Sequence, residues 1–186
     1  MSGVLYLASK SPRRRELLGQ LGREHVVLEV DVAEIRRAAE PALQYVQRVA
    51  RDKAEAGWLQ VENQPGARVL AADTEVILDD EVFGKPNDAA DAAAMLRRLS
   101  GRTHVAVSAV CLRDAAGARE ALCPTRVEFA ELSEAVIAAY IASRECFGKA
   151  GAYAIQGRAG AFITRIEGSY SGVMGLPLFE TSRLLG

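Results

Sequence analysis

Cysteine and histidine are scarce in this chain of 186 residues, and their spacing excludes the common metal sites. The cysteines are Cys111, Cys123 and Cys146, and the only histidines are His25 and His104. An odd number of cysteines without a Cys-x-x-Cys pair argues against a zinc site and against a disulfide framework. Two isolated histidines exclude a histidine-rich site. A catalytic metal would therefore have to be held by carboxylates, as Mg²⁺ and Mn²⁺ are.

Long apolar runs, aromatic residues and an excess of one charge are also lacking. No apolar run approaches the roughly 20 residues that span a bilayer, and no signal peptide is evident at the start, which predicts a cytoplasmic protein without membrane contact. Lys plus Arg number 23 and Asp plus Glu number 24, with 6% aromatic residues, a balance that argues against nucleic-acid binding. With 49% hydrophobic residues, we expect one domain over residues 1–186.

Apolar periodicity predicts strands and helices mixed along the whole chain, and therefore an α/β fold with a mixed sheet. Strands are expected at 4–8, 25–32, 68–78, 82–83, 104–112, 125–130 and 161–166, and helices at 13–21, 41–58, 88–99, 133–143 and 178–185. The strand over 68–78 is expected to be interrupted by its polar residues, and the strands at 104–112 and 125–130 are expected to pair. Residues 168–177 are expected to form a packed glycine loop.

A basic segment stands at the predicted junction between the first strand and the first helix, where Ser9 and Ser11 precede Arg13, Arg14 and Arg15. Ser11 is a good N-cap, and Pro12 suits the first helical position. Free N–H groups at a helix N-terminus favour an anion, and arginine binds phosphate oxygens in pairs. The sequence predicts a phosphate site here. The alternative is a capped helix with a solvated basic turn.

A carboxylate and two lysines extend this hypothesis. Asp73 and Thr74 follow the buried run Val-Leu-Ala-Ala, and a buried carboxylate is costly unless it is paired or binds a cation. Lys53 stands in the helix expected at 41–58, and Lys85 follows the strand at 82–83. Each alone is typical of a turn residue or of surface charge. If they converge with the arginine turn, they supply the positive charge that a polyphosphate needs.

A glycine-bounded stretch, 149–157, brings Lys149, Tyr153 and Gln156 close together in the sequence. Glutamine offers both a donor and an acceptor, the pattern needed to recognise the edge of a base. The alternative is a loop with a tyrosine in the core. No Ser-His-Asp arrangement is present, and His104 is expected to have a structural role.

Taken together, these motifs resemble the Maf family of nucleoside triphosphate pyrophosphatases, the septum-formation-inhibitor homologues. The segments that carry the resemblance are LASKSPRRRELL at 7–18, ARDKA at 50–54, ADT at 72–74, GKP at 84–86, MLRRLSGRTH at 95–104, KAGAYAIQG at 149–157 and GLPL at 175–178. The resemblance implies the two-lobed α/β fold of inosine triphosphate pyrophosphatases, with a long twisted mixed sheet and a cleft between the lobes.

The resemblance also implies an activity: hydrolysis of a nucleoside triphosphate to the monophosphate and pyrophosphate with a divalent cation, Mg²⁺ or Mn²⁺. The Ala-Asp-Thr and Ile-Gln-Gly signatures look like those of the subgroup that acts on dTTP and UTP, as a housecleaning enzyme of the nucleotide pool. The alternatives are hydrolysis of modified pyrimidine triphosphates or of 7-methyl-GTP, and a nucleotide-binding regulator of septum formation without turnover. The resemblance is compatible with a homodimer.

The matched positions give each residue an expected role. Asp73 would activate the attacking water, and Glu34 with Asp73 would hold the metal. The phosphate-binding groups would be Ser9, Ser11, Arg13, Arg14, Lys53 and Lys85, with Lys53 and Lys85 counted as catalytic. Thr74, Gln156 and Arg13 would determine specificity, and Lys149 would lie near phosphate or base. Gly148 and Ala154 depart from the family pattern, which has Asp and Gly there.

Overall fold

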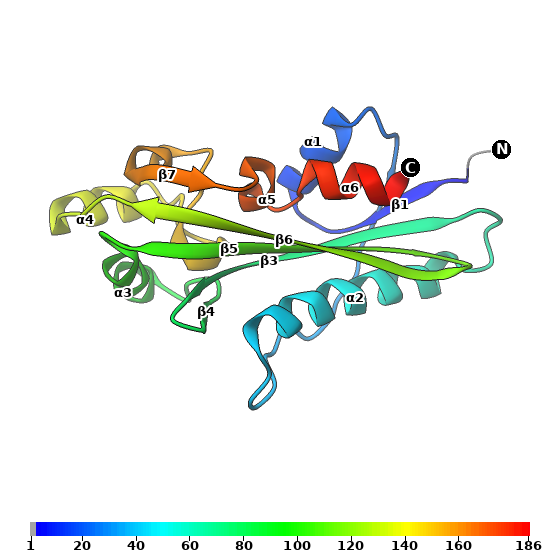
Figure 1. Cartoon of the computed structure of the whole chain (residues 1–186), viewed down its shortest axis with the longest axis horizontal. Helices are drawn as coiled ribbons and strands as arrows, with labels where there is room; N and C mark the ends of the chain where they lie inside the picture. Colours follow the sequence, from blue (N-terminus) through cyan, green and yellow to red (C-terminus); the bar gives the residue numbers. More distant parts are fainter. Residues whose placement is uncertain (1–2) are drawn as a thin grey trace. The chain divides into compact units, whose positions relative to one another are not determined.

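The computed structural model describes residues 3–186 as a mixed α/β protein built on one seven-stranded sheet (Figure 1). The strand order is β2-β1-β3-β5-β6-β7, with β4 paired to β3. The strands are β1 Leu5–Ala8, β2 Val26–Leu28, β3 Arg68–Leu78, β4 Glu81–Phe83, β5 Thr103–Asp114, β6 Gly117–Phe129 and β7 Ile163–Glu167. The helices are α1 Pro12–Gln20, α2 Ala42–Val61, α3 Ala89–Leu99, α4 Glu134–Ala142, α5 Tyr170–Met174 and α6 Leu178–Leu185, with short 3₁₀ helices at Ala150–Ala152 and Arg158–Phe162.

The chain divides into two compact units. Unit 1 contains the chain up to Asp73 together with Ser108–Cys123 and Gly175–Gly186, and unit 2 contains Thr74–Val107 and Pro124–Met174. Strands β3, β5 and β6 each contribute residues to both units. Within the described residues 3–186, no helix is both long and apolar enough to cross a membrane.

In unit 1, β1 pairs in parallel with both β2 and β3. Helix α2 lies on one face of these strands, while α1 and α6 lie on the other (Figure 1). The contact of α2 is close because Gly57 has no side chain: a Cβ there would lie 2.8 Å from Val69 Cγ1 and 3.0 Å from the Cβ of Ala8. At this position the apolar face of α2 therefore packs directly against β1 and β3.

In unit 2, one apolar core joins β3, β5 and β6 to α3, α4 and the segment 150–162. The aromatic rings of Phe129, Tyr140, Tyr153 and Phe162 lie edge to face in it, with centroid distances between 4.9 and 6.1 Å. Such edge-to-face packing is the favoured arrangement of aromatic quadrupoles. The core therefore reaches directly under the segment that carries Lys149 and Gln156.

The structure confirms the predicted fold class and most elements, with corrections. The expected strand at 25–32 is only Val26–Leu28, because β2 has a sheet partner on one side alone and leaves Val26 and Val27 exposed. The strand at 68–78 is not interrupted: Asp73 lies within the continuous strand β3 and is buried there. The expected pair at 104–112 and 125–130 extends into the long neighbouring strands β5 and β6. The expected loop at 168–177 contains helix α5.

Candidate active site

A cluster of charged side chains in unit 1 is centred on Lys53. This residue projects from α2, and its Nζ lies 2.8 Å from Asp73 Oδ1 and 2.7 Å from Glu34 Oε1. The side chain of Lys53 is 12% exposed and that of Asp73 5% exposed, whereas Glu34 is 35% exposed. One ammonium therefore bridges two carboxylates, and the group keeps a net negative charge at the border of the core.

Asp73 lies within β3, in a run of buried residues, and is itself buried. Its Oδ2 atom is buried and has no hydrogen-bond partner among the described residues. A buried carboxylate oxygen without a partner costs free energy, so the position favours an additional cation or donor. Glu75, two residues further along the same strand, is a second buried carboxylate that the sequence analysis passed over.

Glu34 lies in a segment without helix or strand, Glu29–Pro41, named here the Glu34 segment. Helix α2 holds it by side chains one turn apart: Tyr45 donates its hydroxyl to the Glu34 carbonyl at 3.0 Å, and Arg48 donates to the Ile35 carbonyl at 2.9 Å. The Arg48 guanidinium also binds both carboxylate oxygens of Glu40, at 2.7 and 2.9 Å. This fork holds the pKa of Glu40 down at about 2.

The junction between β1 and α1 has the predicted helix start. Ser11 is the N-cap and its Oγ accepts the Arg14 N–H at 3.5 Å, with Pro12 in the first turn. The buried Ser9 hydroxyl accepts the Ser11 N–H at 3.2 Å. Arg14 Nε donates to the Gly175 carbonyl at 2.8 Å, so Arg14 ties the start of α1 to the segment before α6. Both serines and Arg14 thus have structural contacts, and Arg13 is half-buried beside them.

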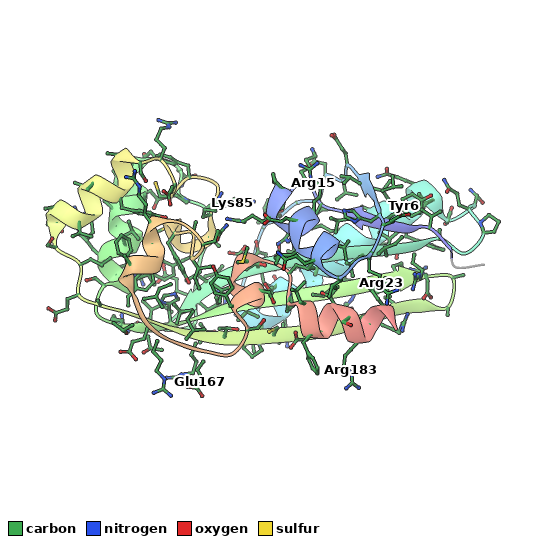
Figure 2. All side chains as sticks on the ribbon, turned by 90° about the horizontal axis from the view of Figure 1, so that it is seen from above. Tyr6, Arg15, Arg23, Lys85, Glu167 and Arg183 are labelled. Atoms are coloured by element: carbon green, nitrogen blue, oxygen red, sulfur yellow. The ribbon has the colours of Figure 1, made fainter. Side chains whose placement is uncertain are left out.

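The remaining predicted residues, Thr74, Lys85, Lys149 and Gln156, belong to unit 2. Lys85 follows β4 and is exposed (Figure 2). Its neighbour Gly84 accepts the Gly151 N–H at 3.1 Å, so the segment of Lys85 is tied to the segment of Lys149. Gln156 is exposed and Lys149 half-buried.

The donor set of unit 1 fits a hard divalent cation. Within the described residues, no group of three or more His, Cys, Asp and Glu side chains is placed to hold a metal. Mg²⁺ in phosphoryl-transfer sites nevertheless uses one or two protein carboxylates and completes its shell with water and substrate phosphate. Glu34 and the unpartnered Oδ2 of Asp73 match that requirement, and the Lys53 ammonium lies within 2.8 Å of both carboxylates.

Comparison with known proteins identifies the family. The model of the Maf family, described as Maf-like protein, matches residues 4–186. The chain belongs to this family. It is 57% identical to a dTTP/UTP pyrophosphatase of Xanthomonas euvesicatoria pv. vesicatoria, over 98% of this chain and 97% of that protein. It is 53% identical to a dTTP/UTP pyrophosphatase of Chromobacterium violaceum, over 97% of this chain and 92% of that protein. A nucleoside triphosphate pyrophosphatase of Xylella fastidiosa is 52% identical, over 98% and 97%.

The residues that hold the predicted site residues of this Maf protein in place carry almost no signal in the sequence. Arg48, Tyr45 and Glu40 carry no motif, and only the Arg48–Asp52 spacing of four residues hinted at an ion pair, which the structure has at 3.1 Å. Tyr140 and Glu145, which contact the segment of Gln156, gave no signal, because their partners are distant in the sequence.

Proposed function

We propose that this Maf protein is a nucleoside triphosphate pyrophosphatase that acts on dTTP and UTP. It would cleave the bond between the α- and β-phosphates, release the nucleoside monophosphate and pyrophosphate, and remove unwanted triphosphates from the nucleotide pool. The observation that carries this proposal is the buried Asp73 carboxylate, bridged by Lys53 to Glu34 and left with one unpartnered oxygen. The names of the relatives support the choice of dTTP and UTP.

The chemistry assigned to the chain needs no covalent intermediate. A water molecule attacks the α-phosphorus, Asp73 takes its proton, and the bridging oxygen leaves with pyrophosphate. Asp73 suits this role because one of its oxygens is fixed by Lys53 while the other has no partner among the described residues. Lys53 donates a hydrogen bond to Asp73 Oδ1 and would add positive charge next to the reacting phosphate.

Glu34 and Asp73 are the proposed metal ligands. A divalent cation held by these two carboxylates would neutralise phosphate charge and stabilise the leaving pyrophosphate. The proposed phosphate-binding residues are Ser9, Ser11, Arg13, Arg14, Lys53 and Lys85. The proposed specificity residues are Thr74, Gln156 and Arg13, and Lys149 is proposed to lie near phosphate or base. The single domain over residues 1–186, the homodimer and the cytoplasmic location stay predictions.

The decisive experiment measures pyrophosphate release with Mg²⁺ or Mn²⁺ from dTTP, UTP, CTP, dCTP, GTP and 7-methyl-GTP, for wild type and Asp73→Asn. Removal of the general base is expected to lower turnover by about 10²–10⁴. The matched control is Asp79→Asn, which makes the same change at a side chain 61% exposed and ion-paired to Arg102. Because Asp79 has a φ of 53°, a conformation that asparagine adopts readily, the control is expected to fold and to turn over normally.

The result separates the alternatives. Turnover concentrated on dTTP and UTP and lost in Asp73→Asn would support both the activity and the role of Asp73. A preference for 7-methyl-GTP would keep the reaction and overturn the substrate. Nucleotide binding without turnover on any triphosphate would make the protein a regulator, and near-normal turnover of Asp73→Asn would remove the assigned base.

A further inference from the structure

The proposed base-recognising residue, Gln156, stands in a tight turn. The Gly157 N–H donates to the Ala154 carbonyl at 3.0 Å and closes the turn Ala154–Gly157, named here the Gln156 turn. Ile155 is buried and Gln156 is exposed, so the turn is anchored by one central residue and presents the other. The orientation of the Gln156 carboxamide therefore depends on how firmly the two ends of the turn are held.

Two side chains hold the ends of the Gln156 turn. The Ala154 N–H donates to the Tyr140 hydroxyl at 3.1 Å, in a buried contact with the end of α4. Beyond the other end, the Arg158 N–H donates to Glu145 Oε2 at 2.8 Å. A Cβ on Gly157 would overlap the same Glu145 carboxylate, so the backbone itself lies against it. Both anchors come from α4 and the residues that follow it.

A third anchor acts through Tyr153, the residue before the turn. Its hydroxyl is hydrogen-bonded to His104 Nε2 at 2.8 Å, and both rings pack edge to face on Phe129 with centroid distances of 4.9 Å. His104 is 1% exposed, and its Nδ1 has no hydrogen-bond partner among the described residues. Because the His104 ring is buried in this way, it does not transfer protons to solvent. It fixes Tyr153, and Tyr153 fixes the entry to the turn.

We propose that Tyr140, and His104 acting through Tyr153, are positioning residues that determine base selection by Gln156. This inference rests on the proposed function, because it assumes that Gln156 contacts the base. Uracil and thymine present an acceptor beside the N3 donor, whereas cytosine presents a donor beside an acceptor. A carboxamide matches either pattern if it rotates by half a turn. Discrimination therefore comes from a fixed orientation rather than from the presence of glutamine alone.

The test uses two nearly isosteric changes, Tyr140→Phe and Tyr153→Phe, in the full-length protein. Each removes one hydroxyl and keeps its ring in the aromatic core. The ratio of kcat/KM for dTTP to that for dCTP is expected to fall about tenfold, the equivalent of one hydrogen bond, through a higher KM for dTTP with kcat nearly unchanged. Amide hydrogen exchange at residues 154–158 is expected to become faster.

Three controls separate positioning from loss of folding. Tyr170→Phe, at an exposed tyrosine of α5, is expected to keep the wild-type ratio. His104→Gln, which retains a polar atom for the Tyr153 hydroxyl, is expected to restore discrimination that His104→Leu loses. In Gln156→Ala, which is expected to have lost discrimination already, adding Tyr140→Phe should lower the ratio no further.

The outcomes distinguish this inference from the proposed function. If the wild type releases no pyrophosphate, the proposed function fails and the inference falls with it. If the wild type discriminates and Gln156→Ala does not, while both tyrosine variants keep the wild-type ratio, only the positioning role is overturned. The same holds if the tyrosine variants lower the melting temperature and leave the ratio unchanged. If Gln156→Ala keeps the wild-type ratio, Gln156 does not select the base and the inference is wrong.

Discussion

Two irregular segments each carry one of the proposed functional residues, Glu34 and Gln156, and they are held in opposite ways. In unit 1, the Glu34 segment is held by charge: Arg48 binds the Glu40 carboxylate and the Ile35 carbonyl. In unit 2, the Gln156 turn is held mainly by neutral groups, with the Tyr140 and Tyr153 hydroxyls placed by aromatic packing. The first kind of anchoring surrounds proposed metal ligands, and the second surrounds a proposed base contact.

The difference has a physical reason. The Glu34 side chain is 35% exposed, so its segment lies near the surface, where an arginine side chain stays charged and can hold it. The Arg48 fork suits this because a guanidinium fixes several acceptors at once. A group that distinguishes bases has to keep one orientation, which close packing and buried hydrogen bonds enforce better than exposed charges do. The two anchoring modes should therefore respond differently to packing, pH and charge.

The largest expected effect is a loss of stability on substitution of Gly151, in the packed part of unit 2. Its φ is 67°, and a Cβ there would lie 2.9 Å from Val76 Cγ2. Gly151→Ala combines a left-handed conformation with overpacking and is expected to lower the free energy of unfolding by roughly 2 to 4 kcal/mol. Urea unfolding measures this loss.

The matched control for that change is Gly148→Ala. Gly148 has a nearly identical φ of 68°, but no atom lies within 4 Å of a Cβ added there. Only the backbone term remains, so a loss of about 1 kcal/mol is expected. Equal losses at both positions would show that the close approach to Val76 adds nothing to the cost of the Gly151→Ala change.

A smaller expected effect is the pH dependence of stability, which should differ between the packed anchoring of unit 2 and the ionic anchoring of unit 1. Burial lowers the pKa of His104 from 6.5 to about 4, so the folded protein keeps it neutral while the unfolded chain takes up a proton below pH 6.5. Stability from this group is present above pH 6.5 and is lost as the pH falls towards 4. Between pH 7 and pH 5 the loss amounts to about 2 kcal/mol.

The stability contributed by Glu40, in the ionic anchoring of unit 1, is expected to stay nearly constant between pH 7 and pH 5. The pKa of Glu40 is lowered from 4.5 to about 2, so its contribution is present above pH 4.5 and is lost only as the pH falls from there towards 2. Urea unfolding of His104→Gln at pH 7 and pH 5 checks the assignment, because this variant should lose the pH-dependent part. A wild-type slope retained in His104→Gln would assign it to other groups.

The fold was predictable where local patterns decide it. Ser11 followed by Pro12 defined the start of α1, and the apolar run around Asp73 defined β3, both of which the structure confirms. The limits of β2 were not predictable, because an alternating pattern does not reveal that a strand lies at the edge of a sheet. Helix α5 was missed because two glycines surround it and its five residues give little periodicity.

The site was predictable only in part. Lys53, Asp73 and Glu34 were recognised from the family motifs, and the structure brings these three together. Their supports were not, since Arg48 and Tyr140 are ordinary helix residues until the tertiary structure gives them partners. Ala154 replaces the glycine of the family pattern without strain, because it is not among the described residues with a positive φ.

The smallest expected effect tests the ionic side through Arg48. Arg48→Lys keeps the charge but loses the planar fork that binds Glu40, Asp52 and the Ile35 carbonyl together. With the Glu34 segment less firmly held, the Mn²⁺ concentration for half-maximal pyrophosphate release is expected to rise about tenfold, as for supports of other metal ligands. Arg51→Lys is the control, since Arg51 stands on the same helix and forms an exposed pair with Glu120. An unchanged Mn²⁺ requirement in Arg48→Lys would mean that the Arg48 fork does not position Glu34, and a rise in both variants would trace the effect to α2 as a whole.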